Sequence, residues 1–212
     1  TKSTKLALPH QPYRRPFPAN SFFIPRPMLK LRLPFAAILL SLTFSSFARA
    51  ENWPQWRGTK LDGVSHEKDL PVKWSKTEGI AWRLEMPGAA GATPVVWEDK
   101  IFLTSTDGDK LILMCVGTHG KEIWRQQVST GNRDVRGDEG NSASNSPCTD
   151  GKHVWAMMAD GVLACYSLDG KEVWKQDLSA KYGKFKIQFG MTSSPVLDNG
   201  RLYLQLIHGD GN

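Results

Sequence analysis

The chain has 212 residues, and its formal net charge of +6 at pH 7 comes from 27 basic and 21 acidic side chains. Eight of the basic residues and none of the acidic ones lie in the first fifty positions, so the rest of the chain is slightly acidic. A nucleic-acid-binding domain needs a basic face on the folded part of the protein. The charge distribution therefore excludes nucleic acid as the expected partner.

The first fifty residues are typical of an export signal and a segment before it. Residues 1–27 are rich in proline and basic residues, and we expect them to be disordered or to precede the true start at Met28. Residues 28–50 combine Lys30 and Arg32, an apolar run over 35–47, and the small-residue site Ala48-Arg49-Ala50. As a helix, that run reaches only about 20 Å, short of a bilayer core of about 30 Å. The prediction is an exported protein, periplasmic or extracellular, with no transmembrane span after cleavage.

Residues 51–79 form a lead-in, and a β-rich segment follows over 80–86. Its residues Ile80-Ala81-Trp82-Arg83 are similar to two later segments, at 123–125 and 173–175, each of which ends a repeat. No complete repeat precedes it. We therefore predict that 80–86 is an outer strand that completes the last unit of a closed ring, with the other units beyond Asn212 and this chain an N-terminal fragment.

The next segment, 92–127, divides into four short β-rich runs. Turn signals at Glu98-Asp99, Asp107-Gly108 and His119-Gly120 separate them, and Asp-Gly is favoured in tight hairpins because these need positive φ. The predicted strands lie near 94–97, 100–105, 110–116 and 121–127.

The segment 145–177 repeats this organisation. Its predicted strands lie near 147–149, 152–158, 162–167 and 171–177, with Asp-Gly pairs at 150–151, 160–161 and 169–170. A third unit begins in 192–212 and contains about two strands.

The two complete segments repeat each other in sequence. Cys115, Gly120 and Trp124 recur fifty residues later as Cys165, Gly170 and Trp174, and a Ser/Thr-Pro pair precedes each unit, with its proline at 94, 147 and 195. A period near fifty with four antiparallel strands is the length of a propeller blade. The predicted fold is an all-β, incomplete β-propeller of about two and a half four-stranded blades.

These residues resemble the PQQ-like β-propeller repeat, in its exported, non-enzymatic form. The resemblance rests on the Ser/Thr-Pro-Val starts, on Gly-Lys-Glu-(Ile/Val)-Trp at the outer strands, and on the leader Trp-Pro-Gln-Trp-Arg-Gly at 53–58. It implies that Trp82, Trp124 and Trp174 pack between adjacent blades. The chain departs from the family pattern before the outer turn, where Cys115-Val116-Gly117 and Cys165-Tyr166-Ser167 replace the usual Ala-x-Asp.

No reactive set of residues is visible in the sequence. Three cysteines, Cys115, Cys148 and Cys165, are an odd number for a disulfide framework, and small apolar fillers are the expected role. No cofactor is predicted from this chain; PQQ and Ca²⁺ remain possible only if other blades supply their ligands. The sequence leans towards a non-enzyme, and the alternatives are part of a quinoprotein dehydrogenase or an accessory domain of a larger enzyme or sensor.

The loops that lead into the inner strands offer a candidate binding face. They run from an outermost strand to the next innermost strand, so they lie on one face and approach the central channel. Polar side chains gather there, although Asn and Ser in loops also satisfy turn backbones. The predicted function is a scaffold that binds a protein or a polymer with this face, and its candidate residues are Asn141, Ser144, Asn145, Gln188, Thr192 and Ser193.

Overall fold

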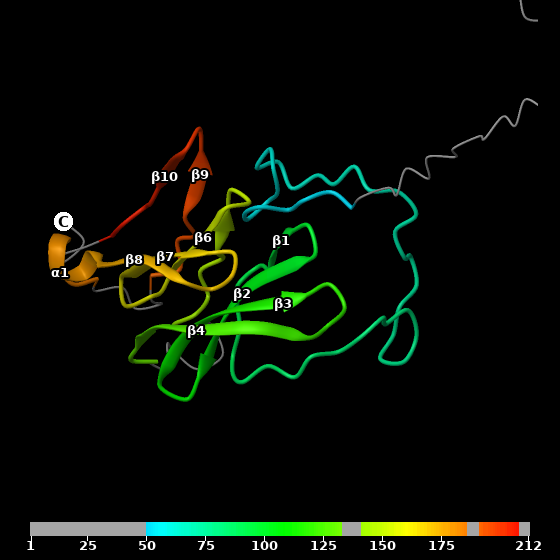
Figure 1. Ribbon diagram of the computed structural model, residues 1–212, viewed down its shortest axis with the longest axis horizontal. Coiled ribbons are helices and arrows are strands. Elements are labelled where there is room, and N and C mark those ends of the chain that lie inside the picture. Colours follow the sequence, from blue (N-terminus) through cyan, green and yellow to red (C-terminus); the bar gives the residue numbers. More distant parts are fainter. Residues whose placement is uncertain (1–49, 133–140, 186–190, 208–212) are drawn as a thin grey trace, which may run out of the picture. The chain divides into compact units, whose positions relative to one another are not determined.

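The computed structural model describes residues 50–132, 141–185 and 191–207. Within these ranges the chain forms ten strands and one short helix (Figure 1). The predicted signal, apart from Ala50, and the segment before it lie outside the described residues.

The first blade is a four-stranded antiparallel sheet in which neighbours in sequence are neighbours in space. It contains β1 (Val95–Trp97), β2 (Lys100–Asp107), β3 (Lys110–Gly117) and β4 (Glu122–Thr130). β-Branched and aromatic residues are frequent in β1, β2 and β4. Two-residue turns join β1 to β2 and β2 to β3, because Trp97 pairs with Lys100 and Asp107 with Lys110.

The second blade repeats the first, and a third begins after it. The second consists of β5 (Cys148–Thr149), β6 (His153–Met157), β7 (Val162–Ser167) and β8 (Glu172–Asp177). Two further strands, β9 (Val196–Asp198) and β10 (Arg201–Tyr203), form an antiparallel pair. The predicted fold class is confirmed: the described chain holds two four-stranded propeller blades and the first two strands of another.

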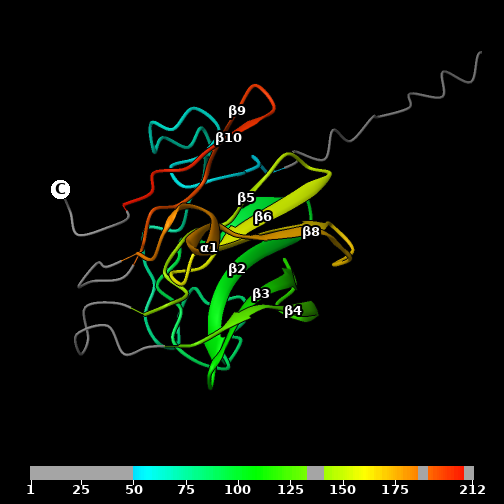
Figure 2. The ribbon, with the colours of Figure 1, turned by 90° about the vertical axis from the view of Figure 1, so that its left-hand side faces the viewer.

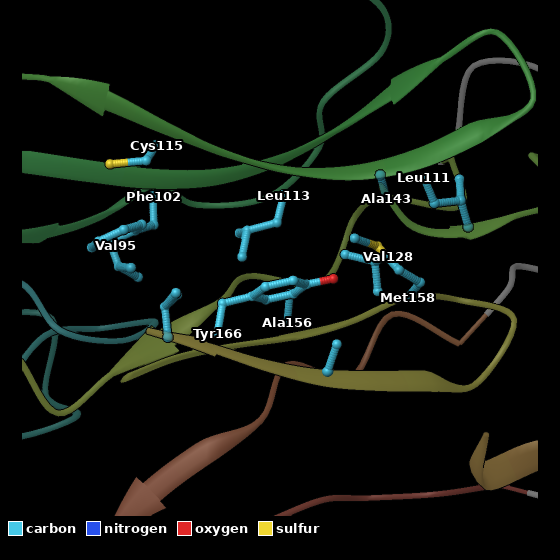
Figure 3. Packing of buried hydrophobic residues seen from close by; sticks show 12 residues of the cluster. Val95, Phe102, Leu111, Leu113, Cys115, Val128, Ala143, Ala156, Met158 and Tyr166 are labelled. Carbon is cyan, nitrogen blue, oxygen red and sulfur yellow. The ribbon is translucent and has the colours of Figure 1, made fainter. Parts of the chain in front are cut away.

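The main core lies between the two blades (Figures 2 and 3). In β3, Leu111, Leu113 and Cys115 point from blade one toward blade two, as the two-residue period of a strand requires. Ala156 and Tyr166 meet them from blade two. Neither blade can bury this face alone, so the two fold as a stack.

The other faces of the two blades are also covered. On blade one, Ile112, Met114 and Val116, which point to the other face of β3, are buried as well. On blade two, Met157 and Leu163 pack with Leu178 and Met191 from the connection to the third blade. Each complete blade is thus enclosed by its neighbours in sequence.

Two features differ from the sequence-based expectation. Residues 80–86 form no strand, although Trp82 lies on blade one as described below. A helical turn, α1 (Leu178–Tyr182), follows β8, because the Asp177 carboxylate caps it by accepting from the Ala180 N–H at 2.9 Å. In the described part of the chain, no helix has the length and apolar character needed to cross a membrane.

Candidate binding groove along the innermost strands

The three innermost strands begin with the same hydrogen-bonding arrangement. Thr93, Ser146 and Ser194 each precede the proline that leads into β1, β5 or β9. The Thr93 N–H donates to Ser146 Oγ at 2.9 Å, and the Ser146 N–H donates to Ser194 Oγ at 2.9 Å. A hydroxyl at this position therefore joins each blade to the one before it.

The loop that precedes β5 is held against blade one. Thr104, on β2, donates its hydroxyl to the carbonyls of Ala143 and Asn145 at 2.8 and 3.0 Å. Thr104 is fully buried, so these bonds form away from water. They fix the position of the neighbouring residues Ser144 and Ser146.

The lead-in crosses all three innermost strands, one residue to each. The Trp53 N–H and carbonyl pair with the carbonyl and N–H of Val96, both at 2.8 Å. The Pro54 carbonyl accepts from the Thr149 N–H at 2.8 Å. Gln55 Oε1 accepts from the Leu197 N–H at 2.9 Å.

Val96, Thr149 and Leu197 occupy the same place in their repeats, two positions after the proline. The three-residue segment Trp53-Pro54-Gln55, which we call the axial strap, therefore satisfies equivalent backbone groups in three blades. Its first part lies beside β1 in Figure 1, in cyan. Gln55 is buried, and beyond it the chain turns at Gly58, whose N–H donates to the Gln55 carbonyl.

Beside the strap lies a groove of about 640 Å³. Two aromatic rings, Trp56 and Tyr203, border it, each about half exposed. Hydroxyl side chains make up much of its lining, which carries no charged side chain among the described residues. The hydroxyl residues are Thr93, Ser144, Ser146, Thr192, Ser193 and Ser194. We call this cavity the axial groove.

The predicted binding residues divide into two groups. Ser144, Thr192 and Ser193 line the axial groove. Asn141 and Asn145 do not: Asn141 Oδ1 accepts from the Ala143 N–H at 2.8 Å, and Asn145 Nδ2 donates to the Ser193 carbonyl at 2.8 Å. Gln188 lies outside the described residues.

Asn145 differs most from its expected place at a channel mouth, because it is fully buried. Its amide connects the second blade to the third, and its Oδ1 has no hydrogen-bond partner within the described chain. The two asparagines thus form hydrogen bonds with backbone groups, whereas Ser144, Thr192 and Ser193 line the groove.

Trp82 and Trp124 make matching contacts on successive blades. The Trp82 indole N–H donates to the Thr118 carbonyl at 2.8 Å, and the Trp124 indole N–H donates to the Leu168 carbonyl at 3.1 Å. Both carbonyls belong to the turn before the outermost strand. Trp82 therefore makes the same contact with blade one that Trp124 makes with blade two, even though Trp82 does not lie in a strand.

Each of these rings lies on a glycine with positive φ. A Cβ at Gly120 would be 2.5 Å from Cδ2 of Trp82, and one at Gly170 would be 2.9 Å from Cδ2 of Trp124. Trp174 lies in the cluster that faces the third blade.

Trp97 packs between blades as well, although the sequence did not point to it. A Cβ at Gly151, in the β5–β6 turn, would be 2.2 Å from Cζ2 of Trp97, so this ring too packs against the next blade. Asp150 and Asp198 occupy the corresponding places in the later repeats, and a search for recurring residues therefore passes over it.

The cysteines are buried and unpaired with one another. Cys115 and Cys165 lie opposite Trp124 and Trp174 in the sheets, next to matching β-bulges. Burial raises the pKa of Cys115 and Cys148 to about 12 and that of Cys165 to about 11. In the ranges that the structure describes, no group of three or more His, Cys, Asp or Glu side chains could hold a metal ion.

Comparison with protein families gives one match, over residues 64–205. The matching family model is described as outer membrane protein assembly factor BamB. Among curated protein sequences none matches the chain.

Several solved structures are similar in part, including the following two. BamB from Moraxella catarrhalis is 18% identical with a TM-score of 0.42, and the match covers 58% of this chain and 33% of that one. The quinohemoprotein alcohol dehydrogenase from Comamonas testosteroni is 21% identical with a TM-score of 0.45, over 73% of this chain and 23% of the other. The chain thus matches a third or less of the length of either protein.

Proposed function

Because the chain belongs to the family described as outer membrane protein assembly factor BamB, we propose that it is an exported, non-catalytic scaffold that binds another protein. Export is supported by the signal-like pattern of residues 28–50. The binding surface is the rim of the axial groove, where the loops of successive blades meet.

The observation that carries this proposal is the convergence of three repeats on one place. Gly91, Ser144 and Thr192 stand three positions before the proline in their respective repeats, and all three line the groove. Gly91 and Thr192 are exposed, so a partner can reach them. Loops on one face of a rigid scaffold are a common place for partners to bind.

Site-specific photocrosslinking tests the location. A photoreactive amino acid at Thr192 or Gln205, both exposed at the groove, is expected to capture the same protein in intact cells. The matched control carries the photoreactive group at Glu172, an exposed position on the outermost strand β8. The captured protein, once identified and purified, should bind the wild-type chain, and Thr192→Arg should weaken that binding by at least about tenfold.

Capture of one protein equally at all three positions would contradict a partner site at the groove. Unchanged affinity of the purified partner for Thr192→Arg would contradict it as well. Circular dichroism of Thr192→Arg controls for folding.

A further inference from the structure

We propose that the floor of the axial groove binds a neutral oligosaccharide, an activity separate from the protein binding proposed for its rim. The inference rests on three observations: which hydrogen-bonding groups are already occupied, the charge of the lining, and the two aromatic rings at its border.

The strap leaves little backbone for a peptide ligand to pair with. A peptide that adds to a sheet edge needs free N–H and C=O groups along a strand. At the innermost strands the chain itself engages both backbone groups of Val96, through Trp53, and the N–H groups of Thr149 and Leu197, through Pro54 and Gln55. What the groove offers a ligand is therefore mainly side chains.

Those side chains are hydroxyls, which can donate and accept at once. Ser194 accepts from the Ser146 N–H of the preceding blade and retains its own O–H to donate, whereas Ser146, which accepts from the Thr93 N–H in the same way, is almost fully buried. Thr93 and Ser193 add further hydroxyls to the lining. Sugar hydroxyls have the same dual character, so a polyhydroxylated ligand suits this surface.

The charge of the lining favours a neutral ligand. Among the described residues that border the groove, none is charged. An anionic ligand would lose hydration there, and no side chain of the lining itself supplies a cation to offset that loss. Arg57, next in sequence to Trp56, has its guanidinium carbon 5.7 Å from the Trp56 ring centre and donates to the Asp62 carbonyl at 3.0 Å.

The aromatic border supplies the apolar contact. Trp56 is 48% exposed, although a ring of this size usually buries most of its surface, and Tyr203 borders the groove as well. The C–H face of a sugar ring is apolar and flat enough to pack on such a ring. A volume of about 640 Å³ lies within the range of small-molecule sites, about 300–1,000 Å³.

Isothermal titration calorimetry of the full chain tests the proposal with three defined probes. Maltohexaose and hexa-N-acetylchitohexaose are neutral, and hexagalacturonate is anionic. At least one neutral hexamer is expected to bind, and hexagalacturonate at least about tenfold more weakly.

Trp56→Ala should weaken that binding by about tenfold, as loss of one aromatic contact does. The matched control is Trp74→Ala, which removes another exposed lead-in tryptophan that does not border the groove, and it should leave binding unchanged. Ser193→Ala should also weaken binding, and it leaves both rings and the rim residue Thr192 in place.

Absence of binding by both neutral hexamers would overturn the proposal. So would tighter binding of hexagalacturonate, or equal effects of the two tryptophan changes. The proposed protein partner is measured separately: if it still binds the rim while no sugar binds, only the oligosaccharide site fails. If it fills the groove itself, so that Trp56→Ala weakens the partner and no sugar binds, the groove is a protein site.

Discussion

At the scale of single residues, pairs of tryptophan and glycine join the blades. Trp124 lies between Phe102 and Tyr166, with ring centres 5.9 and 6.4 Å away, and its edge rests on the turn that contains Gly170. Gly170 serves two purposes there: its φ of +86° suits the turn, and its missing side chain makes room for the indole. The recurring glycine is therefore part of the docking contact.

Replacing Gly170 by alanine, together with a control glycine, should distinguish the cost of backbone strain from the cost of a collision with Trp124. Gly200 is the control, because its φ of +74° is similar but a Cβ there would meet open space. Gly200→Ala should lower the free energy of unfolding by about 1 kcal/mol from backbone strain alone. Gly170→Ala should lower the free energy of unfolding by about 1–3 kcal/mol more than Gly200→Ala does, because the methyl group collides with Trp124. Urea denaturation of both variants measures the difference, and equal losses would show that the ring makes room easily.

The buried thiols should be unreactive in the folded protein. Burial raises the pKa of Cys115, Cys148 and Cys165 well above the ordinary value, so the folded state holds its thiol protons more tightly than the unfolded state does. Below the thiol pKa of the unfolded chain, 9.0, the thiols are protonated in both states and the free energy of unfolding does not depend on them. As the pH rises from 9.0 toward 11 or 12, the thiols of the unfolded chain ionise first, and the free energy of unfolding falls.

Titration with a thiol-specific disulfide reagent at pH 8 checks this expectation. The folded chain should give almost no reaction, whereas the chain in guanidinium chloride should release three equivalents. Rapid reaction of one thiol in the folded protein would show that it is exposed.

At the scale of elements, the axial strap acts on three blades through three consecutive residues. A strand would normally pair with a single neighbour, but this segment runs across the ends of β1, β5 and β9, which lie side by side. The third contact depends on the Gln55 side chain, because its amide oxygen, and not a backbone carbonyl, accepts from the Leu197 N–H. The strap therefore sets the spacing of the innermost strands, and with it the position of the groove lining.

Gln55→Ala should loosen the third blade without unfolding the first. The Leu197 N–H would lose its acceptor, at a cost of about 1–3 kcal/mol if water cannot replace it. Hydrogen exchange followed by mass spectrometry should show faster exchange in β9 and β10 and unchanged exchange in β3. Gln176→Ala, an exposed change on β8, is the control, and a uniform increase over all blades would contradict a local role for the strap.

At the scale of the whole described unit, stability depends on contacts between blades rather than within them. β3 is buried along nearly its whole length because blade two covers one face and blade one's other face is also closed. Two polar atoms at or near this packing, Tyr166 Oη and Ser129 Oγ, have no hydrogen-bond partner in the described chain. Apolar contact and aromatic packing outweigh that cost.

Trp124→Ala should therefore destabilise both blades together. Removing the indole leaves a cavity between Phe102 and Tyr166 and takes away the bond to the Leu168 carbonyl, for a loss of about 3 kcal/mol or more. Its neighbour Ile123 is half exposed, and Ile123→Ala should cost well under half as much. Thermal unfolding followed by near-ultraviolet circular dichroism measures both. A loss confined to one blade would show that the blades unfold independently.

The sequence predicted the strands more closely than the site. Hairpin turns such as Asp107-Gly108 and Asp169-Gly170 are local signals, since positive φ is required within two residues, and the strands lie within a few residues of their predicted positions. Asn145 was expected at a channel mouth and lies inside, because which side of a loop faces water depends on the blade that packs against it.

The lead-in was the least predictable segment. Trp53, Gln55 and Trp56 have no counterparts in the repeats, and their partners lie from about forty to more than one hundred and forty residues away. Nothing local marks such a contact. Tyr203 escaped notice for the same reason, since its place at the groove depends on how the lead-in folds against the third blade.

The amino-acid sequence by itself determined the repeat, the four-stranded blade and the spacing of the indole rings, because turn chemistry and strand periodicity act over a few residues. Only the tertiary structure decided which hydroxyls face a common groove, that Asn145 is internal, and that one short segment connects three blades. Those outcomes follow from packing between segments far apart in the chain, where each side chain's exposure is set by its neighbours.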